Sequence, residues 1–66
     1  MKGRQFVRRL RRAGAEVIEG RGKGGHMLAK YQGNQATIPF HGDRDLSPAF
    51  LKMLCRQLGI DPKEVL

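Results

Sequence analysis

The stretch HMLAKYQGNQATIPF, residues 26–40, reads as two β-strands joined by a short turn. The two strand-like runs, 26–31 and 35–40, flank Gln-Gly-Asn, a connection of hairpin length. Side chains alternate along a strand, which divides the hairpin into an apolar face (Met27, Ala29, Tyr31, Ala36, Ile38, Phe40) and an opposite face (His26, Leu28, Lys30, Thr37). Pro39 has no amide hydrogen to donate, so we expect it at a strand end or on a sheet edge.

The segments on either side of this hairpin predict a third strand and two helices. AEVIE, residues 15–19, is β-branched at its centre, which favours a strand. Apolar residues recur at helical spacing from Phe6 to Ala13 and Gly14 follows, which predicts a helix over 3–13. Residues 41–45 have turn composition. Ser47-Pro48 then resembles a helix start, apolar spacing continues to Gly59, and we expect a helix over 48–58 and a further turn capped by Asp61.

This order of elements predicts an α+β fold, in which two helices cover one face of a three-stranded antiparallel sheet. A chain of 66 residues buries only about 60% of its unfolded surface and cannot be divided between two cores. Residues 1–66 are therefore expected to form a single domain. A deep enclosed cavity is not expected at this size, so a surface site for a large partner is favoured.

The charge is strongly positive and local. The chain has 13 Lys and Arg against 6 Asp and Glu, and six of the positive charges lie in the first twelve residues: Lys2, Arg4, Arg8, Arg9, Arg11 and Arg12. Such a patch is typical of a protein that binds a polyanion, usually nucleic acid and sometimes an acidic protein. A solvated helix face without a partner is the plainer alternative. Binding to a membrane surface is disfavoured because this short helix needs its apolar stripe for the core.

Cysteine and histidine usage limits the chemistry. Cys55 is the only cysteine, which excludes an intramolecular disulfide and the zinc-ribbon spacings, and its core-facing helical position favours packing over nucleophilic catalysis. One cysteine and two histidines do not make a set of metal ligands, so we expect neither a metal nor a cofactor. No signal peptide or apolar run of about 18 residues is present, so we expect a cytoplasmic protein without a membrane segment.

The loop GRGKGGH, residues 20–26, is the strongest candidate for a site. Three of its glycines formally satisfy G-x-G-x-x-G, but a strand follows the loop, whereas a dinucleotide site requires a βαβ unit. The glycines could let backbone amides approach a phosphate, with Arg21 and Lys23 adding charge, or could serve only a flexible turn. The residues alone do not choose between these two roles.

The two histidines are the candidate acid/base groups. A histidine beside a phosphate-binding loop suits RNA cleavage, because its ordinary pKa of about 6.5 lets it take a proton from a ribose 2′-hydroxyl or donate one to the leaving oxygen. His26 is therefore a candidate catalytic residue, although a lone histidine is more often structural or merely exposed. His41 could be a second acid/base, an RNA contact, or a turn residue without a special role.

Several motifs in this order resemble one family. The basic first helix, the GKGGH loop, the TIPFHG strand end and the LSPAFLKMLCRQLGI helix together are similar to the HicA family of bacterial mRNA interferase toxins. The resemblance implies a double-stranded-RNA-binding-like α-β-β-β-α fold, a ribonuclease activity without a metal, and His26 as the active histidine. The family more often has Gly-Ser-His where this chain has Gly24-Gly25-His26, a difference that removes a hydroxyl from the loop.

The predicted function is thus that of an RNA endonuclease toxin. The resemblance further implies a HicB-type antitoxin as partner, through which alone operator DNA would be bound. We expect His26 to act as the acid/base, with RNA contacts from Arg4, Arg8, Arg9, Arg12, Lys23, Gly24, Gly25, Lys30 and His41. A non-catalytic double-stranded-RNA-binding module is the main alternative, and a domain that binds an acidic protein is a third.

Overall fold

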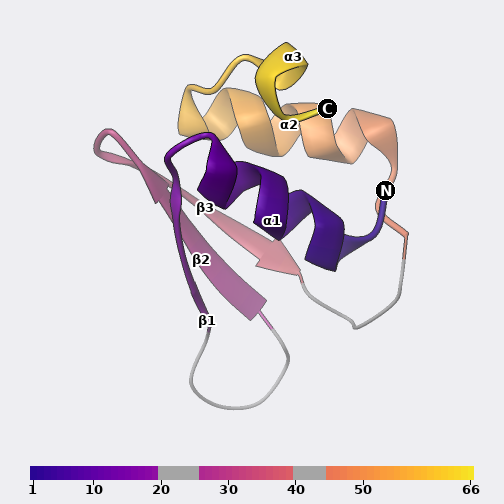
Figure 1. Ribbon diagram of the computed structural model, residues 1–66, viewed down its shortest axis with the longest axis horizontal. Coiled ribbons are helices and arrows are strands. Elements are labelled where there is room, and N and C mark those ends of the chain that lie inside the picture. The colour runs from indigo at the N-terminus through magenta and orange to yellow at the C-terminus, as the bar shows by residue number, and fades with distance from the viewer. Residues whose placement is uncertain (20–25, 40–44) are drawn as a thin grey trace.

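A computed structural model of the chain describes residues 1–19, 26–39 and 45–66. Its elements are α1 (Gly3–Arg12), β1 (Glu16–Glu19), β2 (His26–Tyr31), β3 (Asn34–Pro39), α2 (Pro48–Leu58) and α3 (Pro62–Val65). The three strands form one antiparallel sheet in the order β1-β2-β3 (Figure 1). The α+β architecture and the order of its elements confirm the prediction.

The hairpin of β2 and β3 has a tighter turn than the sequence suggests. Tyr31 pairs directly with Asn34, so only Gln32 and Gly33 form the turn, with φ angles of 47° and 87°. Two consecutive positive φ angles are typical of the type I′ turn, whose twist matches that of the flanking strands. The second strand therefore begins one residue before the predicted start. Pro39 ends β3 on the edge of the sheet, as expected, whereas Phe40 lies outside the described residues.

The core lies between one face of the sheet and the helices. The buried strand residues alternate as predicted and all point to this face: Val17, Met27, Ala29, Ala36 and Ile38. Phe6 and Leu10 of α1 and Leu51, Leu54 and Leu58 of α2 complete the layer. Figure 1 shows α1 lying across the sheet, with α2 beside it and α3 packed on the helical layer. Both long helices thus cover one face, which leaves the other face of the sheet without a covering helix in the described residues.

Local chemistry sets the helix ends. The Ser47 hydroxyl accepts a hydrogen bond from the Phe50 amide at 3.2 Å, and the Asp61 carboxylate accepts one from the Lys63 amide at 3.0 Å, so both predicted N-caps are confirmed. Gly59 ends α2 in the left-handed conformation with φ 81°. The Asn34 amide nitrogen donates to the Leu58 carbonyl at 3.0 Å, which ties this helix end to the start of β3.

Side chains from the helices occupy a carbonyl on each outer strand of the sheet. Arg11 of α1 donates to the Val17 carbonyl of β1 at 2.9 Å. Gln57 of α2 donates to the Gln35 carbonyl of β3 at 3.3 Å. Each edge strand is therefore linked to a helix through its backbone. None of the helices in the described ranges has the length and apolar composition needed to cross a bilayer.

Candidate functional site

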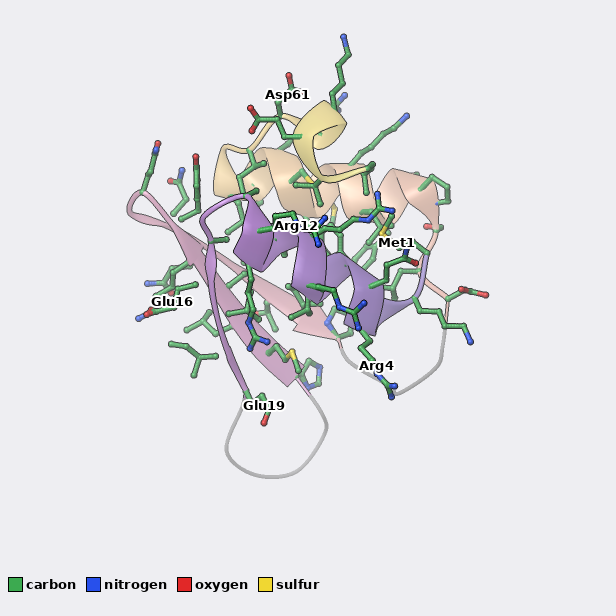
Figure 2. All side chains as sticks on the ribbon, in the orientation of Figure 1. Met1, Arg4, Arg12, Glu16, Glu19 and Asp61 are labelled. Carbon is green, nitrogen blue, oxygen red and sulfur yellow. The ribbon has the colours of Figure 1, made fainter. Side chains whose placement is uncertain are left out.

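A groove lies between α1 and the neighbouring ends of β1 and β2. Arg4, Arg8 and Arg11 recur on one face of α1 at the spacing i, i+4, i+7, so their side chains project from the same side of the helix. Val7 of α1, Glu19 of β1 and Met27 of β2 complete the lining of the groove, whose volume is about 330 Å³. Figure 2 shows Arg4 and Glu19 on the same side of the molecule, below α1 in that view. The helix and the sheet together therefore build a basic surface site.

The floor of the groove is apolar and its rim is charged. Val7 and Met27 belong to the buried core and expose only a small surface, whereas the three arginines and Glu19 are exposed. The bond from Arg11 to the Val17 carbonyl fixes this guanidinium beside β1. Three arginines and one glutamate line the groove, which therefore attracts anionic groups and also offers a carboxylate that only accepts hydrogen bonds.

Two of the predicted arginines do not reach this groove. Arg9 points to the other side of α1 and donates to the carbonyl oxygens of Val65 and Leu66, at 3.1 and 3.3 Å. It therefore anchors α3 to α1. Arg12 is exposed and lies on the upper side of α1 in Figure 2, toward α2 and α3 and away from Glu19. The structure thus divides the basic helix into a groove side and a side that faces α3.

His26 lies next to the groove along β2. It is the first residue of the strand, pairs with Pro39 and is exposed, which confirms that it is not part of the apolar layer. The following residue, Met27, lines the groove and pairs with Glu19 across the β1–β2 ladder. The backbone of the candidate acid/base is therefore one residue, about 3.8 Å between Cα atoms, from the groove floor, and its side chain leaves β2 on the face opposite Met27.

Lys30 lies further along the same strand. It is exposed and pairs with Glu16 and Gln35, and it does not line the groove. The remaining candidates, Lys23, Gly24, Gly25 and His41, lie outside the described residues, and so does the rest of the glycine loop before His26. Their expected contacts with RNA stay predictions.

Two charged residues of the groove, Arg11 and Glu19, were not among the site residues that the sequence predicted. Arg11 could have been found from its helical spacing to Arg4 and Arg8, since the three recur on one helix face. Glu19 could not, because its place depends on the register of β1 against β2. The carboxylate becomes part of the site only when that register brings it beside Met27.

The remaining reactive group lies in the core. Cys55 is fully buried, and this burial raises the pKa of its thiol above the ordinary value, because the thiolate would lose its hydration. The thiol is therefore held neutral, which is unfavourable for a nucleophile. No group of three or more His, Cys, Asp or Glu side chains with metal-site geometry occurs in the ranges that the structure describes.

Comparisons with known proteins place the chain in one family. A protein family described as "HicA toxin of bacterial toxin-antitoxin" matches residues 3–60. A protein from Photorhabdus laumondii subsp. laumondii, named "Probable mRNA interferase HicA 1", is 32% identical over 60 residues, covering 91% of this chain and 100% of the relative. No solved structure matches the chain significantly. The family match spans nearly all of the fold described above, and the chain belongs to the HicA family of bacterial toxin-antitoxin toxins.

Proposed function

We propose that this protein is an endoribonuclease toxin that cleaves mRNA through His26 and is neutralised by a HicB-type antitoxin. The observation that supports this most strongly is the position of an exposed histidine one residue from an arginine-lined groove. The groove offers the charge that a polyanion requires, and His26 offers an imidazole, the side chain that most often serves as a general acid or base. The mRNA interferase name of the Photorhabdus relative agrees with this assignment.

The proposed reaction is the transfer of a phosphoryl group within the RNA. The ribose 2′-oxygen attacks the adjacent phosphorus and loses its proton, while the bond to the 5′-oxygen breaks and that oxygen gains a proton. His26 either accepts the first proton or donates the second. The arginines of α1 stabilise the negative charge that develops on the phosphoryl oxygens. Histidine chemistry of this kind requires no metal.

In this proposal the basic residues contact different parts of the RNA. Arg4 and Arg8 hold the RNA at the groove, while Arg12 and Lys30 add positive charge farther from His26. Lys23, Gly24 and Gly25 would position the backbone beside His26, and His41 would contribute a second contact. Phosphate contacts provide affinity without reading sequence, so the arginines alone would give cleavage of loose preference.

The test compares RNA cleavage by the wild type, His26→Ala and Thr37→Ala. Thr37 is an exposed residue of β3 and serves as the matched control for a surface substitution on the sheet. We expect His26→Ala to lose about 10²- to 10⁴-fold in cleavage rate, the usual range for a general acid or base, and to keep its RNA affinity. Thr37→Ala should cleave like the wild type.

Each step of the proposal has a result that would refute it. Equal cleavage by the wild type and His26→Ala would remove the catalytic role of His26. Loss of cleavage on addition of a chelator would remove the metal-free reaction. Salt-sensitive binding of double-stranded RNA, without cleavage by any of the three proteins, would show a binding module instead.

The antitoxin is tested separately. The product of a reading frame beside this gene, co-expressed with tagged toxin, should co-purify with it and should suppress both cleavage and growth arrest. Co-purification that disappears after nuclease treatment would indicate an RNA bridge rather than a direct complex.

A further inference from the structure

The groove beside α1 has a composition that a phosphate alone does not explain. Its floor is formed by two apolar side chains, Val7 and Met27, whereas a phosphate site is lined by donors. Its volume of about 330 Å³ is at the small end of the range for small-molecule sites. A small, flat group with an apolar face and polar edges fits such a groove better than a phosphate does.

Glu19 is the second feature that disfavours a phosphate as the only occupant. Glu19 lines the groove, so its carboxylate would repel a phosphate oxygen bound there. Within the described ranges it makes no hydrogen bond or ion pair, so its oxygens are available to a donor. An ionised carboxylate only accepts hydrogen bonds, and its two oxygens can accept two parallel donors. The ligand edge that meets Glu19 should therefore present two adjacent donors.

We propose that this groove binds a guanine base of the RNA and that Glu19 determines the specificity for it. Guanine is the RNA base whose Watson–Crick edge presents two neighbouring donors, the N1–H and the 2-amino group. The base would rest on Val7 and Met27, with arginine guanidinium planes stacking on its exposed face. The inference rests on the proposed function, since it names the base that the groove takes from the RNA substrate.

The position of the groove connects this base to the reaction. Glu19 pairs with Met27, and His26 precedes Met27 on β2. A base held in the groove lies one residue along β2 from His26, and because the side chains of Met27 and His26 leave the strand on opposite faces, the RNA would pass around the start of β2 between the groove and the imidazole. Cleavage next to guanine is the expected consequence.

The first experiment measures nucleotide binding without any cleavage. The four nucleoside 5′-monophosphates and inorganic phosphate are titrated into the labelled protein at constant ionic strength, and the backbone amide signals of Val7, Glu19 and Met27 are followed by NMR. Guanosine monophosphate should bind about 10- to 100-fold more tightly than uridine monophosphate, as expected for one good bidentate contact. Equal affinity for all four nucleotides, or the same shifts with inorganic phosphate, would overturn the proposal.

Two substitutions test the role of the carboxylate. Glu19→Gln replaces one acceptor oxygen by an amide donor. The glutamine side chain no longer matches the two donors of guanine, but it matches the adjacent donor and acceptor of adenine. The preference should therefore move from guanosine to adenosine monophosphate. Glu16→Gln is the matched control, because Glu16 is an exposed glutamate of β1 outside the groove, and Figure 2 shows it away from Glu19. An unchanged preference for guanosine monophosphate in Glu19→Gln would refute the role of Glu19 in specificity. A loss of this preference in both Glu19→Gln and Glu16→Gln would also refute it.

The second experiment maps cleavage positions in an RNA of mixed sequence. The wild type should cut next to guanine, and Glu19→Gln should lose this preference. Selective binding of guanosine monophosphate without any cleavage would refute the proposed enzymatic function and leave the base site intact. Cleavage without a base preference, together with unselective nucleotide binding, would refute the base site and leave the enzymatic function intact.

Discussion

The contact between Gly59 and Asn34 allows a stability prediction with a worked magnitude. Gly59 ends α2 with φ 81°, and a Cβ atom placed there would lie 2.9 Å from the Asn34 amide nitrogen. That nitrogen donates the 3.0 Å hydrogen bond to the Leu58 carbonyl. Gly59→Ala should therefore have two separate costs: the left-handed backbone conformation of alanine and the displacement of Asn34 from the helix end.

Each cost can be estimated. A left-handed conformation costs an L-residue about 1–2 kcal/mol, and a lost hydrogen bond about 0.5–1.5 kcal/mol. We expect Gly59→Ala to lower the free energy of unfolding by about 1.5–3.5 kcal/mol, the sum of the two costs. Gly33→Ala is the matched control, since Gly33 has φ 87° and no atom within 4 Å of its added Cβ, so it should lose only about 1–2 kcal/mol. The free energy of unfolding of the whole 66-residue domain is expected to be only about 3–10 kcal/mol, so either loss is easy to measure.

The assay is urea unfolding followed by circular dichroism, with the two glycine variants measured alone and Gly59→Ala also measured in an Asn34→Ala background. Asn34→Ala removes both the hydrogen bond and the crowded atom, so the cost of Gly59→Ala should fall by about 1 kcal/mol there. In thermal unfolding the same difference corresponds to about 4–8 °C. An equal cost of Gly59→Ala in both backgrounds would refute the role of Asn34.

Three further outcomes follow from the structure. Arg9→Ala should lower the free energy of unfolding by about 1 kcal/mol, because the carbonyls of Val65 and Leu66 lose their donor. Arg12→Ala should change this free energy by less than about 0.5 kcal/mol, and equal losses in urea unfolding would contradict the role of Arg9. Burial raises the pKa of Cys55, so at alkaline pH the folded thiol stays protonated while the unfolded thiol ionises. The free energy of unfolding should therefore fall above about pH 8.5 more steeply in the wild type than in Cys55→Ala. Parallel pH profiles of the two proteins would contradict this effect of burial. Arg8→Ala should reduce the slope of log affinity for single-stranded RNA against log salt by about 0.7, and Lys63→Ala on α3 should leave it unchanged in fluorescence anisotropy.

Most of the fold could be predicted because its signals are local. Ser47, Gly59 and Asp61 mark helix ends through their own side chains or backbone, and the structure confirms all three. The hairpin boundary was wrong by one residue, because the turn requires a positive φ at Gln32, a conformation that this residue type seldom adopts. Pairing between Tyr31 and Asn34 imposes that conformation, and a local pattern does not show it.

The site was less predictable because it depends on contacts that are distant in the sequence. Charge and spacing could identify Arg4 and Arg8, but they could not separate Arg8 from Arg9, whose partners lie 56 and 57 residues away. Likewise, Glu19 resembles any exposed glutamate at a strand end. Only the strand register and the packing of α1 bring it into the groove.

The hydrogen bond from Arg11 to the Val17 carbonyl has a consequence for how variants should be interpreted. An open edge strand can pair with the strand of another molecule, and proteins commonly cover such edges to remain monomeric. Arg11 occupies one carbonyl of the edge strand β1, as Gln57 occupies one carbonyl of β3, and Arg11 also lines the groove. A substitution of Arg11 would therefore change the exposed edge of β1 and the groove at the same time. Loss of activity in an Arg11 variant can be assigned to the groove only when the variant is shown to be monomeric.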